Sequence, residues 1–320
     1  MRAAALIIAG IFGVTICLRA QAPNPQSPPP YFDEPSFIVA GVADPSARGG
    51  HGADPALRSA EALAKATAAL RTAAASDTNP LEAVRAYQRA AKIDPSEPNL
   101  FNWGTELLSH HASVQAVEVF SNGHRLFARS TRILLGLAVA LYSRGSYDQA
   151  AQRFFEAADL DPSDPAPYLF LGKISSGAIQ DLAGYAQRME RFAHLHPENA
   201  WANYYYAATL IGSAPSQAQA LLDKAVRLDP KLGEAFLLLG ILNADAQNLP
   251  LAISAYQNAI RVSPGMEEAH YRLAMAYRKT GKAEQAQKEL ELYQQLQKQS
   301  AEALERERSQ IQQFVFDLKR

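Results

Sequence analysis

The sequence lacks most of the features that identify an enzyme. Its single cysteine, Cys17, cannot form an intramolecular disulfide, and it lies in the apolar N-terminal stretch. We find no nucleophile elbow, phosphate-binding loop, zinc-protease motif or dinucleotide fingerprint. An excess of one charge is also missing, since 31 lysines and arginines face 32 aspartates and glutamates. A balanced surface does not attract nucleic acid, so we exclude that class of partner.

The histidines do not have the spacing of a metal site. His110 and His111 are adjacent and His194 and His196 are two apart, so the side chains of each pair diverge on a helix. Neither pair has Asp, Glu or Cys partners at ligand spacing. His51 lies between glycines and near two aspartates, and it is the remaining candidate for a metal or enzymatic site. We expect no catalytic residue, no metal and no cofactor, and an envelope enzyme or metal protein centred on His51 is kept as an alternative.

Residues 1–22 have the pattern of an export signal. Arg2 precedes an apolar run from Ala3 to Leu18, and Arg19 follows it. This run is slightly short for a membrane span, which favours a signal peptide over an uncleaved N-terminal anchor. We therefore expect an exported protein of the periplasm or cell envelope, anchored in the inner membrane if the segment is retained.

Residues 23–53 form a proline-rich spacer and an extended arm. The spacer, Pro23–Pro30, is semi-rigid by composition. The arm contains a short apolar, β-prone run, Phe37–Val42, which needs a surface to bury against. The arm, residues 31–52, is predicted either to cap the rest of the chain or to dock on a partner.

Most of the remaining chain repeats one pattern at a spacing of 34 residues. The clearest copy is Gly233–Pro264, where Leu239 and Gly240 lie on one face of a first helix and Tyr256 lies on one face of a second. Small residues at Gly240, Ala252 and Ala259 let the two helices approach closely, and the large Leu239 and Tyr256 fill the space beside that contact. Each copy therefore predicts a helix hairpin that must pack against its neighbours to bury its apolar faces.

These residues resemble the tetratricopeptide repeat family, which has a W-x2-L-G-x2-Y, A-x3-F, P pattern. The resemblance covers about residues 64–300, or seven units. It implies an all-α, right-handed solenoid over residues 54–300, with a concave groove lined by first helices that binds peptides or protein segments. A long helix from Ala283 to about Phe316, including an extension over residues 301–320, is predicted to cap the last repeat, with Leu290, Tyr293, Leu296, Leu304, Ile311 and Phe314 facing inward.

Two copies of the repeat are irregular. In the copy that contains Tyr168 and Gly172, the first helix fits the pattern, but the second carries Tyr185 and Met189 where Ala and an aromatic residue are expected. In the next copy the turn near Gly212 is one residue short. The register of Tyr204, Tyr205 and Tyr206 therefore stays open by one residue.

The family resemblance also implies which residues line the groove. The expected lining is mainly apolar and aromatic, which favours an amphipathic helix or an extended apolar segment over an acidic peptide. The clamp for a terminal carboxylate found in some family members is not expected, because its Lys and Asn positions are not matched. The expected groove residues are Phe101, Asn102, Thr105, Leu135, Val139, Tyr142, Leu169, Phe170, Lys173, Asn203, Tyr204, Leu237, Leu238, Ile241, Tyr271, Arg272, Met275 and Arg278.

The sequence thus favours a non-enzymatic interaction scaffold that holds a protein segment in an apolar groove in the cell envelope. A second hypothesis is a structural envelope protein that self-associates through the long C-terminal helix, as in a coiled coil. Both hypotheses give the chain a protein partner, which is another protein in the first and a second copy of the chain in the second.

Overall fold

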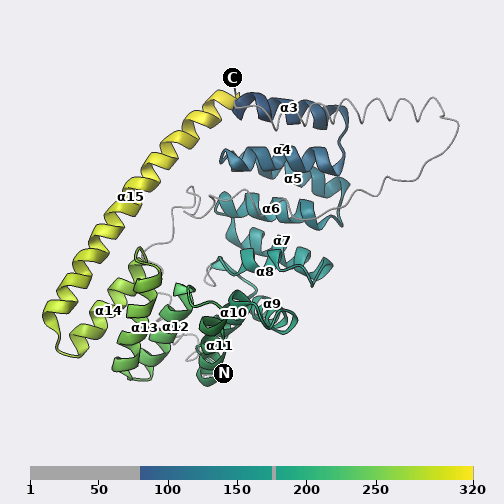
Figure 1. The fold of residues 1–320 in the computed structure, drawn as a ribbon. Helices are drawn as coiled ribbons and strands as arrows, with labels where there is room; N and C mark the ends of the chain where they lie inside the picture. Colours follow the sequence, from purple (N-terminus) through teal and green to yellow (C-terminus); the bar gives the residue numbers. More distant parts are fainter. Residues whose placement is uncertain (1–79, 175–177, 320) are drawn as a thin grey trace, which may run out of the picture. The chain divides into compact units, whose positions relative to one another are not determined.

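A computed structural model describes residues 80–174 and 178–319 of the 320-residue chain. The described part is all-α, as predicted, and consists of helix hairpins followed by one long helix (Figure 1). The predicted leader, spacer, arm and first helix lie outside the described residues. The helices are α3 (Pro80–Ile93), α4 (Glu97–Ser109), α5 (Ser113–Leu126), α6 (Thr131–Ser143), α7 (Tyr147–Leu160), α8 (Ala166–Leu171), α9 (Leu182–Leu195), α10 (Ala200–Leu210), α11 (Pro215–Leu228), α12 (Gly233–Asp245), α13 (Leu249–Val262), α14 (Glu267–Lys279) and α15 (Ala283–Lys319).

The helices follow the predicted 34-residue period. The even-numbered helices α4 to α14 are the first helices of six hairpins, and each packs against the odd-numbered second helix that follows it in the chain. The second helices α3, α5, α7, α9, α11 and α13 each have 14 residues. The helix α15 has 37 residues and continues far beyond the length of a second helix, which confirms the predicted long C-terminal helix.

The described chain divides into two compact units. The N-terminal unit comprises residues 80–160, with α3 to α7, and the C-terminal unit comprises residues 161–306, with α8 to α14 and most of α15. In each unit a second helix also packs against the first helix of the next hairpin. Apolar faces that one hairpin leaves open are therefore covered by its neighbour.

Close contact between glycine and an aromatic ring holds the hairpins together. A Cβ atom added at Gly104 of α4 would lie 2.5 Å from Cζ of Phe120 on α5, and one added at Gly136 of α6 would overlap the same ring. Gly240 of α12 faces the ring of Tyr256 of α13 in the same way. Phe120 and Tyr256 are nearly inaccessible to solvent. A side chain at these glycines would keep the helices apart.

The turns between the two helices of a hairpin are also repeated. Four of them place a residue with positive φ at positions 111, 145, 247 and 281, which are separated by multiples of 34. Gly145 and Gly281 adopt this conformation easily, whereas His111 and Gln247 adopt it with a Cβ atom. In each turn the next residue donates its N–H to a carbonyl five residues earlier, as Ser146 does to Leu141. This bond closes a Schellman motif at the end of the first helix.

The two irregular copies differ from this pattern in ways that the sequence predicts only in part. The start of α11 follows the start of α10 by 15 residues, one fewer than the 16 between α6 and α7, in line with the short spacing expected near Gly212, and Ala214 donates to Leu210 only four residues earlier. The first helix α8 was expected to be regular, but it ends at Leu171 after six residues. Gly172 at its end faces the ring of Tyr205 from α10, in place of an aromatic residue from its own second helix. The shortened helix α8 thus packs its glycine against a ring from the next hairpin, whereas the regular hairpins use a ring from their own second helix.

Candidate partner-binding surface

Three first helices carry a polar side chain that bonds to the backbone carbonyl of a proline in the loop before the helix. Tyr168 donates its hydroxyl to the carbonyl of Pro162 at 3.2 Å, and Asn203 donates Nδ2–H to the carbonyl of Pro197 at 2.9 Å. Nε2 of His270 lies 3.0 Å from the carbonyl of Pro264. In all three cases the carbonyl belongs to the proline six residues earlier. We call these three side chains the latch residues.

The latch residues resolve the register that the sequence leaves open. Asn203 occupies the position that Tyr168 and His270 occupy in their own hairpins, so Tyr204 is the residue beside it on the first-helix face. Asn203 is buried and donates a second bond, at 2.7 Å, to the carbonyl of Asn199. Because a buried amide is costly to leave unpaired, Asn203 serves the contact between hairpins in this structure.

The expected groove residues differ in exposure. Asn102, Thr105, Leu135, Leu169, Phe170, Tyr204, Leu237, Leu238, Tyr271, Arg272 and Met275 are partly exposed, and Lys173 and Arg278 are exposed. The other five, Phe101, Val139, Tyr142, Asn203 and Ile241, are buried. The partly exposed residues of the first helices are the side chains that a partner could reach without repacking the core.

In the N-terminal unit, the expected residues pack with their neighbours. The guanidinium of Arg132 on α6 lies 3.8 Å from the ring centre of Phe101 on α4, a cation–π contact between adjacent first helices. The ring of Tyr142 lies edge-on to Tyr147, with ring centres 5.3 Å apart. Burial, together with the nearby Tyr147 hydroxyl, raises the pKa of Tyr142 to about 12. Phe101 and Tyr142 are therefore core residues that a partner would meet only at their edges.

In the C-terminal unit, aromatic side chains gather at α10. The ring of Trp201 lies 5.6 Å from that of Tyr204 and 5.4 Å from that of Tyr205, and the two tyrosine rings lie 5.2 Å apart. Burial raises the pKa of Tyr204, with a further contribution from Glu234. The Tyr206 hydroxyl points elsewhere and bonds Glu190 at 3.0 Å. These contacts give the tyrosines a packing role between hairpins.

The same unit has an apolar stretch on its first helices that stays partly exposed. Leu237 and Leu238 of α12 pack against the buried cluster that contains Leu273 and Tyr277 of α14. Met275 of α14 is also partly exposed. The nearby charge is balanced, since Arg272 is paired with Glu268 at 2.6 Å. We call Leu237, Leu238 and Met275 the apolar face.

The histidines lie where the sequence places them. His110 is in the turn after α4, with Nε2 3.1 Å from Glu106 Oε1, and His194 is at the end of α9, beside the ring of Tyr206. Within residues 80–174 and 178–319, no three His, Cys, Asp or Glu side chains gather as a metal site would require. His51 lies outside the described residues. None of the helices in the described ranges is long and apolar enough to cross a membrane.

Comparison with protein families decides what this array is. Two models, both described as tetratricopeptide repeat, match the chain, one over residues 101–165 and 212–267 and the other over residues 243–305. The chain is a tetratricopeptide repeat protein. The matches omit residues 166–211, which contain α8, α9 and α10, and the lengths of α8 and α10 also depart from the pattern.

This tetratricopeptide repeat protein is similar to proteins that differ in organism and in assembly. Anaphase-promoting complex subunit 3 of Schizosaccharomyces pombe is 24% identical over 195 residues, which is 58% of this chain and 28% of the relative. The chain thus spans little more than a quarter of that protein. Among solved structures, the Cut9–Hcn1 hetero-tetramer of the APC/C is similar with a TM-score of 0.55 and 15% identity, covering 78% of this chain and 52% of that one. PilF of Pseudomonas aeruginosa is similar with a TM-score of 0.51 and 20% identity, covering 65% and 96%.

At these identities the structural likeness establishes the fold and leaves the partner open. As a tetratricopeptide repeat protein, the chain is a scaffold for protein–protein interaction, of a kind that is typically non-enzymatic. The sequence identified the first-helix face by its register. It missed the latch residues, whose only signal was a polar side chain six residues after each of three prolines.

Proposed function

We propose that this tetratricopeptide repeat protein is a non-enzymatic scaffold of the cell envelope that binds an apolar or amphipathic segment of a partner protein on its first helices. The observation that carries the proposal is the apolar face of Leu237, Leu238 and Met275, which stays partly exposed beside a packed core. Apolar side chains on a folded surface are suited to an amphipathic helix or an extended apolar segment. The envelope location rests on the leader pattern of residues 1–22.

The binding site can be tested by placing a photo-crosslinking amino acid at Met275 in the protein expressed in its own cells. The matched control carries the same amino acid at Leu251, which is 52% exposed on the second helix α13 of the same unit. We expect a partner protein that is crosslinked from position 275 and not from position 251. Equal crosslinking from both positions would contradict a binding site on the first helices.

Binding of the purified partner segment to two variants then distinguishes an effect on the binding surface from an effect on folding. Leu237→Lys places a charge on the apolar face, and Leu251→Lys places the same charge on the second helix. We expect the first variant to weaken binding by about tenfold to one-hundredfold, which corresponds to the loss of one buried apolar side chain, and the second to leave it unchanged. Thermal unfolding of both variants checks that they are folded.

The envelope location has its own test. The intact mass and N-terminal sequence of the protein isolated from its native cells show whether residues 1–20 or 1–22 have been removed, and fractionation shows the compartment. A processed or membrane-retained protein outside the cytoplasm supports the proposal. An unprocessed protein in the cytosolic fraction argues against it without affecting the proposed binding surface.

A second candidate function is self-association through α15. The observation in its favour is the length of this helix, which exceeds the 14 residues of the other second helices. A helix that continues past its own hairpin offers a surface to a second copy. Sedimentation over a hundredfold range of concentration distinguishes the candidates, since a scaffold for other proteins stays at constant mass and a self-associating protein does not.

A further inference from the structure

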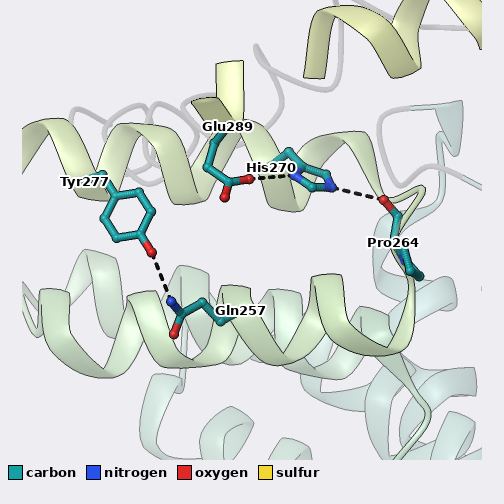
Figure 2. Close-up of polar contacts among 5 residues, drawn as sticks. All are labelled: Gln257, Pro264, His270, Tyr277 and Glu289. Atoms are coloured by element: carbon teal, nitrogen blue, oxygen red, sulfur yellow. Dashed lines mark hydrogen bonds and ion pairs between the residues drawn. The ribbon is translucent and has the colours of Figure 1, made fainter. Parts of the chain in front are cut away.

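Both ring nitrogens of the latch residue His270 face oxygen atoms. Nε2 lies 3.0 Å from the carbonyl oxygen of Pro264, and Nδ1 lies 2.7 Å from Oε2 of Glu289 on α15 (Figure 2). His270 is 4% exposed, so water has little access to either nitrogen. The side chain therefore joins the loop that follows α13, the body of α14 and the long helix α15.

The two contacts require two protons. A carbonyl oxygen only accepts, so Nε2 must carry a proton. The contact between Nδ1 and Oε2 needs a second proton, which either makes the ring an imidazolium or makes Glu289 a carboxylic acid. Both arrangements hold the same number of protons. If one proton leaves, a nitrogen lone pair faces either the Glu289 carboxylate across 2.7 Å or the Pro264 carbonyl across 3.0 Å, so in either tautomer one of the two contacts becomes repulsive.

The neighbouring charged groups have other partners. Glu268 pairs with Arg272 at 2.6 Å, Glu284 pairs with Lys288 at 2.9 Å, and Glu267 accepts a bond from Ser300 at 2.7 Å. In the part of the chain that the structure describes, Glu289 is the charged group that contacts His270. The proton balance of the pair is therefore set mainly by these two residues.

Apolar, aromatic and polar contacts also join α14 and α15. Ala286 is buried in the cluster with Leu273 and Tyr277, and the rings of Tyr271 and Tyr293 lie 5.4 Å apart. The bond between Ser300 and Glu267 is exposed. Over residues 287–303 the side chains of α15 are partly or fully exposed. Among these contacts, the bond between His270 and Glu289 is the one whose histidine side chain is almost fully buried, and bonds that involve a charged group are stronger than neutral ones.

We propose that His270 and Glu289 form a proton-dependent clamp that holds α15 on the last first helix. The folded state binds one more proton at this pair than an unprotected imidazole and carboxylate do near neutral pH, so the clamp is strongest in mildly acidic solution and weakens as the pH rises. Release of α15 uncovers Tyr271, which belongs to the expected groove lining. The inference does not depend on what binds there.

Hydrogen exchange of the full chain, labelled at several pH values from 5.5 to 8 and corrected for the intrinsic exchange rates, measures the docking of α15. We expect amides of residues 286–300 to exchange about tenfold to one-hundredfold faster at pH 8 than at pH 5.5, the range for a lost hydrogen bond to a charged group. Amides of α12 and α13, which do not contact the pair, serve as the internal control and should keep the same protection.

Two substitutions test the role of the proton. Glu289→Gln keeps the shape of the side chain and can donate to a neutral ring or accept from a charged one, so α15 should stay docked and its exchange should not depend on pH. His270→Asn places the side chain that Asn203 uses for the same backbone bond, and its exchange should also be independent of pH. A wild-type pH dependence that both variants retain, or a wild-type protein with none, overturns the proposal.

A measurement on the wild-type protein covers the case in which a variant does not fold. Nitrogen NMR of protein labelled only at its seven histidines reports the protonation of each ring. The ring assigned to His270, by its absence from the His270→Asn spectrum or by its contacts with the residues of α15, should carry protons on both nitrogens, or face a protonated Glu289, at pH 5.5 and lose one proton by pH 8. A neutral ring beside an ionised Glu289 throughout this range refutes the clamp.

Discussion

The contact between Gly104 and Phe120 allows two physical effects of opposite sign to be compared. In an exposed helix, Gly→Ala stabilises by about 1 kcal/mol through helix propensity. At Gly104, however, the new methyl group would lie 2.5 Å from Cζ of Phe120, whereas carbon atoms normally approach to about 3.5 Å. The ring or the helix must therefore move by roughly 1 Å.

The ring of Phe120 has no room for this movement. Its other side faces Gly136 of α6, where an added Cβ atom would also overlap it. The helices α4 and α5 must then separate, and we place the cost near the upper end of the range for overpacking, about 3 kcal/mol. After the propensity gain, Gly104→Ala should lower the free energy of unfolding of the N-terminal unit by about 2 kcal/mol.

The assay uses the distribution of tryptophan. The chain has two tryptophans, Trp103 in the N-terminal unit and Trp201 in the C-terminal unit. A Trp201→Phe background therefore leaves a fluorescence signal from the N-terminal unit alone, and urea unfolding can be followed there without assuming that the two units unfold together.

A glycine in the same unit provides the matched control. A methyl group added at Gly123 of α5 would meet only the side chain of Ile133, at 3.2 Å, which can shift slightly. We expect Gly123→Ala to change the stability by less than about 0.5 kcal/mol, because propensity and contact nearly cancel. A Gly104→Ala variant whose free energy of unfolding equals or exceeds that of the wild type would refute the close-contact reasoning. Partial rescue of Gly104→Ala by Phe120→Leu would identify the ring as the cause.

Three further predictions address the turns, the buried hydroxyls and the latch residues. Gln247→Gly should raise stability by about 0.5 kcal/mol in urea unfolding, because glycine relieves the positive φ but gains freedom in the unfolded chain. Asn203→Ala should lower stability by about 1 kcal/mol, read from Trp201, because the buried amide loses its two hydrogen bonds to the carbonyls of Pro197 and Asn199. Burial raises the pKa of three tyrosines to about 12: Tyr142, Tyr185 and Tyr256. Their contribution to stability should be fully present up to pH 10, the ordinary pKa of tyrosine, and be lost between pH 10 and about 12. Absorbance at 295 nm should show these tyrosines ionising at higher pH than exposed ones, and ionisation near pH 10 would contradict their burial.

The regular part of the fold could be predicted because its determinants are local. The pairing of Gly240 with Tyr256 and the continuous helix from Ala283 depend on residue size, spacing and the absence of helix breakers, all of which the sequence displays. The end of α8 at Leu171 could not be predicted in this way. Gly172 has the expected neighbours in sequence, but its partner in space is Tyr205 from the next hairpin.

The candidate surface was less predictable for a similar reason. Register identifies the face of a first helix, but neighbouring helices decide which of its side chains stay accessible. Ile241 lies on that face and is buried, whereas Leu237, one turn earlier, is partly exposed. Tyr271 lies on the same face of α14, and its ring is in contact with Tyr293 of the long helix. Such differences depend on contacts between elements, which a repeat pattern does not contain.

The latch residues show how one structural task can have different chemical consequences along a repeat array. Tyr168, Asn203 and His270 each bond the carbonyl of the proline six residues earlier, so any side chain of suitable reach with one donor suffices. Tyrosine and asparagine do this at any pH below 10, because neither changes charge there. Histidine adds a second nitrogen, and in the last hairpin that nitrogen meets Glu289. The contact between hairpins is thereby made dependent on a proton only where the array ends and the long helix begins.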